Sequence, residues 1–171
     1  DWILERMLYF PSPGIHFDYE RAGIPAEQIF LTTEDGVRVH AFHLRAPGAT
    51  RALLFLHGNA GNASDRLPNA EILRRLGADV LLLDYRGYGR SEGRPTEEGL
   101  YADARAGLAQ LTGELGVPEE RVVVFGRSIG AAVAVDLAQE RQLAGLILES
   151  AFSSLSDAAA QHFTRLAGLV M

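Results

Sequence analysis

A serine flanked by two glycines, in Gly126-Arg127-Ser128-Ile129-Gly130, is the residue whose type and spacing point most directly to chemistry. A serine hydroxyl at a sharp turn between a buried strand and a helix is the arrangement of a nucleophile in acyl transfer. The glycines are explained by a helix that crosses so close to the strand that a Cβ would clash. The backbone N–H of Ile129 would then lie at the helix N-terminus, where an oxyanion is stabilised.

The residues around this motif are those that such a turn requires. The run Val122-Val123-Val124-Phe125 predicts a strand buried on both faces, and Ala131, Ala132 and Ala134 predict a helix with small side chains against it. In the alternative interpretation, Ser128 only caps the helix. Because a cap does not explain the paired glycines or the alanines, we expect Ser128 to be a nucleophile.

The elements that must position this serine follow from hydrophobic periodicity. From residue 51 onward apolar strands alternate with helices, which predicts a mostly parallel sheet covered by helices on both faces. The expected strands are 52–56, 78–83, 122–125 and 143–149, and the expected helices are 68–76, 96–115 with Thr96 as its cap, and one after Gly130. Two earlier segments, 28–32 and 37–44, flank Asp35-Gly36 and predict an antiparallel hairpin. Alternation in 37–41 indicates a strand with one face in water.

Bulk properties narrow the class of protein. The length of 171 residues indicates a single α/β domain over 1–171, and a net charge of −6 argues against a nucleic-acid partner. There is no cysteine, so disulfides, thiol catalysis and cysteine metal sites are excluded, while the compartment stays open. No window approaches the roughly 20 apolar residues that span a bilayer. We expect no cofactor and no metal, and a cytoplasmic or membrane-associated location.

Four motifs, in order along the chain, resemble those of the α/β-hydrolase family. They are His57-Gly58-Asn59-Ala60-Gly61-Asn62, Asp84-Tyr85-Arg86-Gly87-Tyr88-Gly89-Arg90-Ser91, Gly126-Arg127-Ser128-Ile129-Gly130 and Glu149-Ser150-Ala151-Phe152. They are most similar to the Bem46-like, ABHD13- and ABHD17-like branch, and the resemblance runs from Tyr9-Phe10-Pro11 to about Ser154. It implies a serine hydrolase that cleaves an ester, thioester or amide of a small-molecule or acyl substrate. Members of the branch often carry a membrane anchor ahead of the Tyr-Phe-Pro start, so we expect membrane association through such a segment.

The resemblance also implies where the oxyanion is held. By position, the backbone N–H of Asn59 would pair with that of Ile129, and His57 would support this loop. His57 is not expected to be the base, because the family order is Ser, acid, His. From the residues alone, Gly58 lets the backbone approach closely. The alternative is a tight strand–helix turn in which Asn62 or Ser64 caps a helix.

Residues for the acid and the base are scarce after Ser128. Asp136 lies two turns into the expected helix, about 12 Å along its axis, and points away from the serine. Glu149 ends a strand that lies beside the elbow strand in the family fold, so it is a weak candidate acid. His162 is the only later histidine, in a segment typical of an amphipathic helix, and is a weak candidate base.

The Bem46-like pattern places the acid and the histidine after later strands. We therefore expect the chain to be the amino-terminal two-thirds of a larger hydrolase, without its acid and histidine and poorly active alone. Its last strand would form a sheet edge that the missing segment, a second copy or a swapped partner covers. The alternative function is a non-catalytic binding protein with the same fold.

Overall fold

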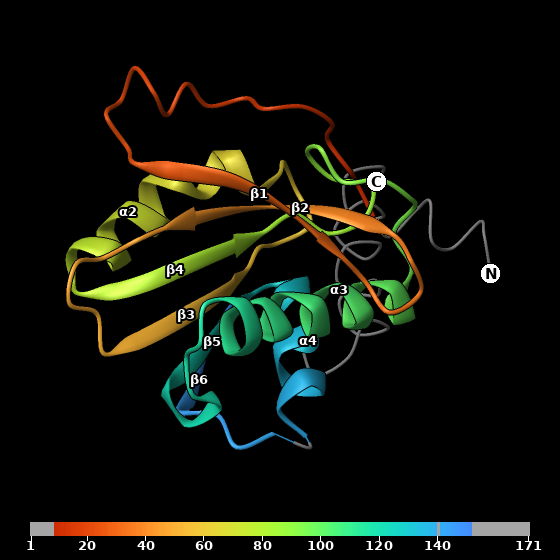
Figure 1. The fold of residues 1–171 in the computed structure, drawn as a ribbon. Helices are drawn as coiled ribbons and strands as arrows, with labels where there is room; N and C mark the ends of the chain where they lie inside the picture. Colours follow the sequence, from red (N-terminus) through yellow and green to blue (C-terminus); the bar gives the residue numbers. More distant parts are fainter. Residues whose placement is uncertain (1–8, 140, 152–171) are drawn as a thin grey trace, which may run out of the picture.

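Six strands form one mixed sheet in the computed structural model, which describes residues 9–139 and 141–151 (Figure 1). The strands are β1 (Ala26–Thr32), β2 (Arg38–Leu44), β3 (Arg51–Leu56), β4 (Ala78–Leu83), β5 (Val122–Arg127) and β6 (Gly145–Glu149), in the spatial order β1-β2-β4-β3-β5-β6. Pairs β3–β4, β3–β5 and β5–β6 are parallel, whereas β1–β2 and β2–β4 are antiparallel. The predicted parallel sheet with an amino-terminal hairpin is confirmed.

Helices cover both faces of this sheet (Figure 1). They are the 3₁₀ turn η1 (Ala63–Arg66), α2 (Leu67–Arg75), α3 (Glu97–Ala109), the π-type turns η2 (Gln110–Glu114), the 3₁₀ turn η3 (Glu119–Arg121) and α4 (Ile129–Ala138). Thr96 caps α3 as predicted, with its side chain accepting from the Gly99 N–H. The helix expected to reach residue 115 changes from α-helical to π-type hydrogen bonding at Gln110. None of the described helices is long and apolar enough to cross a membrane.

The prediction that β2 has one face in water is wrong. Every residue from Val39 to Leu44 is buried, including His40 and His43. The reason is that β2 lies inside the sheet, between β1 and β4, with packed side chains on both faces. Val39 and Ala41 belong to the core cluster that includes α3 and α4, and Phe42 and Leu44 belong to the cluster that includes α2.

The pairing of β3 with β5 brings two distant segments to one edge of the sheet. The register places Leu56 beside Gly126, and the two strands run in the same direction. The residues that follow each strand, from His57 and from Ser128, therefore leave the sheet side by side. This is the carboxyl edge at which open α/β sheets bind their ligands.

Strand β6 lies at the far edge from β1 and, within residues 9–139 and 141–151, pairs with β5 alone. Its apolar side chains Leu146, Ile147 and Leu148 are each about 40% exposed, as expected for a strand with no second neighbour among the described residues. The helix expected around His162 lies outside the described residues. What covers this edge remains a prediction.

Candidate active site

Ser128 occupies a strained turn between β5 and α4. Its φ of 55° and ψ of −117° lie where side chains other than glycine rarely occur, which costs about 1–3 kcal/mol. The flanking glycines make this turn sterically allowed. A Cβ on Gly126 would lie 2.7 Å from Ala131 Cα, and a Cβ on Gly130 would overlap the Leu56 carbonyl oxygen and lie 2.8 Å from that of His57. The helix thus crosses its own strand and β3 at backbone distance.

The Ser128 side chain does not cap α4, because it accepts no hydrogen bond from the first turn of the helix. The backbone is instead fixed on both sides, with the Ser128 N–H donating to the Glu149 carbonyl at 2.9 Å and the Ala131 N–H donating to the Ser128 carbonyl at 2.9 Å. Within the described residues the half-buried hydroxyl has no hydrogen-bond partner. The side chain is therefore available for chemistry that a cap would prevent.

The segment after β3, residues 57–62, lies directly against this serine, and we call it the 57–62 loop. A Cβ on Gly58 would lie 3.3 Å from Ser128 Cβ and 3.9 Å from its Oγ. Asn59 follows Gly58, and Ile129 begins α4 immediately after the serine. The structure thus brings the segment that contains Asn59 against the turn that leads from Ser128 into Ile129, although the two segments are seventy residues apart.

The alternative interpretation, in which this loop caps a helix, also holds for part of it. The Asn62 side chain accepts from the Ser64 N–H at 2.9 Å, and Asp65 accepts from the Asn62 N–H at 3.0 Å, which forms a capping box on η1. The Asn62 amide also donates to the carbonyls of Ser12 and Gly14 at 3.0 and 2.8 Å. Capping explains Asn62, whereas it does not explain the approach of Gly58 to Ser128.

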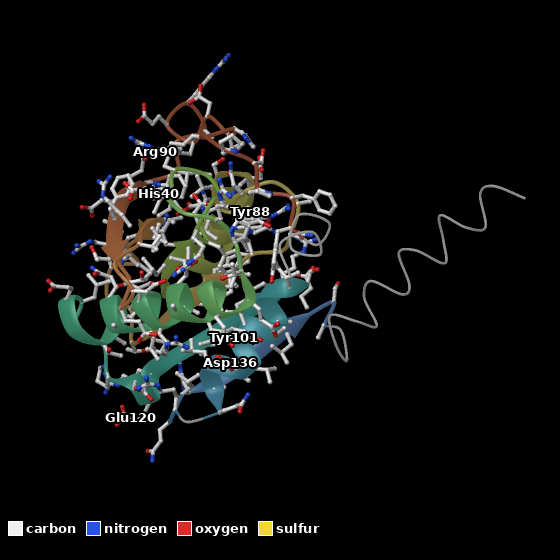
Figure 2. All side chains as sticks on the ribbon, turned by 90° about the vertical axis from the view of Figure 1, so that its right-hand side faces the viewer. His40, Tyr88, Arg90, Tyr101, Glu120 and Asp136 are labelled. Atoms are coloured by element: carbon white, nitrogen blue, oxygen red, sulfur yellow. The ribbon has the colours of Figure 1, made fainter. Side chains whose placement is uncertain are left out.

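Two tyrosines of the turn after β4 hold the first half of the loop. The Tyr85 hydroxyl donates to the His57 carbonyl at 3.0 Å, and the Tyr88 hydroxyl donates to Asn59 Oδ1 at 2.7 Å. The Phe10 N–H donates to the same Asn59 oxygen at 2.9 Å. Burial raises the pKa of both tyrosines, so their hydroxyls stay protonated as donors. Figure 2 shows Tyr88 and His40 on the same side of α3.

A buried cluster of Asp84, His40 and His57 was not anticipated from the sequence. Asp84 Oδ2 lies 2.8 Å from His40 Nδ1, and its Oδ1 accepts from the Ala63 N–H at 2.7 Å and lies 3.6 Å from His57 Nε2. Burial alone would raise the pKa of Asp84, but the hydrogen bond from His40 and the nearby His57 ring hold it below its ordinary value. The sequence contained one signal of this cluster: a polar residue directly follows each of two neighbouring strands, His57 after β3 and Asp84 after β4.

His57 takes part in this cluster and not in a bond to the serine. Its Nδ1 lies 2.7 Å from the Gly58 carbonyl, and the ring is fully buried beside Tyr85 and Tyr88. Arg86 of the same motif forms ordinary ion pairs with Asp35 and Asp103 at 2.7 and 2.9 Å.

The candidates for the acid and the base are not gathered at Ser128. Glu149 Oε1 lies 3.5 Å from Arg127 Nε, and both side chains are partly exposed. Asp136 lies on α4 beside Tyr101 of α3, away from Tyr88 (Figure 2). His162 is outside the described residues. Within the described part of the chain no group of three or more His, Asp or Glu side chains is arranged to hold a metal ion.

Comparison with known proteins gives consistent matches. The family model described as serine aminopeptidase, S33, matches residues 48–171. The uncharacterized protein Rv2307c of Mycobacterium tuberculosis is 44% identical over 161 residues, covering 92% of this chain and 57% of that protein. Protein bem46 of Schizosaccharomyces pombe is 38% identical, covering 90% and 55%. An α/β hydrolase of Vibrio vulnificus superposes with a TM-score of 0.75 at 28% identity, covering 85% of this chain and 52% of that one. The chain thus spans little more than half the length of these relatives.

Proposed function

The chain belongs to the α/β-hydrolase family described as serine aminopeptidase, S33, and from this we propose that it cleaves a carboxylic ester, thioester or amide through an acyl-enzyme on Ser128. The observation that carries the proposal is the Ser128 turn. Its hydroxyl is free of any capping bond, its backbone is strained, and the 57–62 loop lies against it. Strain of this kind persists where surrounding structure holds it and where function uses it.

The proposed reaction has two halves. Ser128 Oγ attacks the carbonyl carbon and loses its proton to a base, while the backbone N–H groups of Asn59 and Ile129 hold the oxyanion. The leaving alcohol, thiol or amine takes that proton, and water then hydrolyses the acyl-serine to release the acid. The macrodipole of α4 adds positive potential at Ile129.

The base is proposed to be a histidine outside the described residues. His40 and His57 are committed to the buried Asp84 cluster, His43 is buried, and His16 contacts Asp65 at 3.1 Å. This leaves the histidine and its acid to residues not described, and His162 is one candidate for the histidine. No metal or organic cofactor takes part in the proposed reaction.

Hydrolysis of a panel of activated substrates by the intact protein tests the proposal. The panel contains p-nitrophenyl acetate and butyrate, an acyl-thioester and an aminoacyl-anilide. Ser128→Ala should lower kcat by about 10⁴-fold or more on whichever class is cleaved, because loss of the nucleophile removes the acyl-enzyme route. Thr112→Ala, which removes a hydroxyl in η2 that donates to the Leu108 carbonyl, should change kcat by less than about twofold.

Two results would contradict this function. Equal turnover by the wild type and Ser128→Ala would place the chemistry elsewhere. A folded intact protein that cleaves none of the substrates and retains them with measurable affinity would favour the alternative, a binding protein with the same fold.

A further inference from the structure

Asp84 is an unusual residue to find in the interior of this sheet. It follows the last residue of β4, its side chain is almost fully buried, and none of the described arginines forms an ion pair with it. A buried carboxylate without a basic partner is costly unless hydrogen bonds replace its hydration. Asp84 receives these bonds from His40 of β2 and from the Ala63 backbone, and its pKa stays below the ordinary value. It therefore carries its charge at neutral pH.

The partners of Asp84 mark the two ends of the 57–62 loop. His57 is the first residue of the loop, and its Nε2 lies 3.6 Å from Asp84 Oδ1. Ala63 is the first residue after the loop, and its N–H donates to the same oxygen at 2.7 Å. One carboxylate oxygen thus faces both points at which the loop joins the rest of the fold.

The turn after β4 holds Asp84 in place. Ser91 Oγ donates to the Asp84 carbonyl at 2.8 Å and accepts from the His40 N–H at 2.8 Å, which links the turn to β2. Gly89 is required at its position, because a Cβ there would overlap the Asp84 carboxylate. The glycine thus leaves the space that the carboxylate occupies.

We infer that Asp84 is a positioning residue, whose carboxylate holds the Ala63 end of the 57–62 loop by a hydrogen bond and faces His57 at the other end, so that the Asn59 N–H is held at Ser128. The inference rests on the proposed function, in which that N–H stabilises an oxyanion. Donors fixed before reaction act on the transition state, whereas a loop that must become ordered during the reaction loses part of that gain. Loosening one end of the loop should therefore lower kcat and leave substrate binding unchanged.

Asp84→Asn in the intact protein tests the inference. Asparagine keeps the volume and can still accept from the Ala63 N–H, but it has no charge and its NH₂ group meets the His40 Nδ1–H. We expect kcat to fall about 10- to 100-fold, with KM within about threefold. The affinity for a trifluoromethyl ketone, which forms an oxyanion on the serine, should fall by about the same factor as kcat.

Asp103→Asn is the matched control. Asp103 is also a fully buried carboxylate, but it bonds to the Arg86 backbone and guanidinium and does not contact the 57–62 loop. Asp103→Asn should lower the thermal midpoint and leave kcat and the affinity for the ketone within about twofold of the wild-type values. Equal kcat losses in the two variants, or a lower thermal midpoint for Asp84→Asn without a loss of kcat, would overturn the inference.

If Asp84→Asn does not fold, a pair of variants at His40 tests the inference instead. His40→Gln keeps an N–H donor for the carboxylate, and His40→Leu does not. kcat should fall at least about tenfold in His40→Leu and stay within about threefold in His40→Gln, and equal values would overturn the inference. Failure of the proposed function is recognised separately, because the ketone would then not bind the wild type and Ser128→Ala would keep its activity.

Discussion

The two sides of Ser128 are built in different ways. On the loop side, residues 57–62 accept hydrogen bonds from Tyr85 and Tyr88, the Ala63 N–H just after the loop donates to Asp84, and α4 crosses at backbone distance. On the β6 side, residues 145–151, the described chain offers one neighbouring strand, exposed apolar side chains and a partly exposed ion pair. From this difference we infer that the described residues already contain the half of the site that is proposed to stabilise the oxyanion. The half proposed to move protons is not among them.

The largest expected effect comes from adding one methyl group on the loop side. A Cβ on Gly130 would lie 2.8 Å from the His57 carbonyl oxygen and overlap that of Leu56, neither of which is a flexible atom. Gly130→Ala should therefore destabilise the intact protein by about 3 kcal/mol or more, or prevent folding. Urea denaturation followed by circular dichroism measures this.

Gly145 on the β6 side is the matched control, because nothing among the described residues lies within 4 Å of its Cβ position. Gly145→Ala should change the free energy of unfolding by at most about 1 kcal/mol, and the favourable direction is expected. If both substitutions had the same effect, the contrast between the two sides of Ser128 would be lost.

Acid should remove the stability that the buried charge of Asp84 provides on the loop side. The pKa of Asp84 is lowered in the fold from an unfolded value near 3.8, so its contribution to stability is fully present above that pH. The contribution is lost as pH falls through the native pKa. Asp84→Asn should therefore flatten the loss of stability below about pH 4, as measured by denaturant unfolding between about pH 2.5 and 6.

Glu71 on α2 provides a comparison for this titration, because it is paired with two arginines, one of which is largely exposed. Hydrogen bonding from Arg74 lowers its pKa to about 2, so its stabilisation is lost as pH falls from about 4.5 towards 2. Glu71→Gln should also flatten the acid loss, but this effect should shrink in 0.5 M salt, because Arg75 of this group is largely exposed. An Asp84 effect that is equally screened by salt would contradict its burial.

The smallest effect is expected on the β6 side. Glu149 and Arg127 are partly exposed and 3.5 Å apart, so their pairing contributes about 0–1 kcal/mol. Glu149→Gln should lower stability by no more than this and change kcat by less than about threefold. A fall in kcat of about 10³-fold would instead identify Glu149 as the acid of the reaction and would place proton transfer on the described β6 side.

The features that the sequence predicted well are formed by residues that lie close together in the chain. The Ser128 turn could be found because its strand, glycines and alanines lie within a dozen consecutive residues, and the hairpin could be found from Asp35-Gly36. The Asp84 cluster could not be found in this way, because it joins His40 to a residue 44 positions away through the spatial order β2-β4-β3. The burial of both faces of β2 depends on the same order, which explains why the expectation of a wet face was wrong.

Covalent labelling of Ser128 tests the central claim most directly. Trypsin should release residues 128–141 as one peptide, because arginine stands at 127 and 141, and Ser128 is the only hydroxyl residue within it. After reaction of the intact protein with a fluorophosphonate, mass spectrometry should find the phosphonyl adduct on this peptide, and none after Ser128→Ala. An unmodified peptide 128–141 from the folded wild type, under conditions that label a control serine hydrolase, would contradict the assignment of Ser128 as the nucleophile.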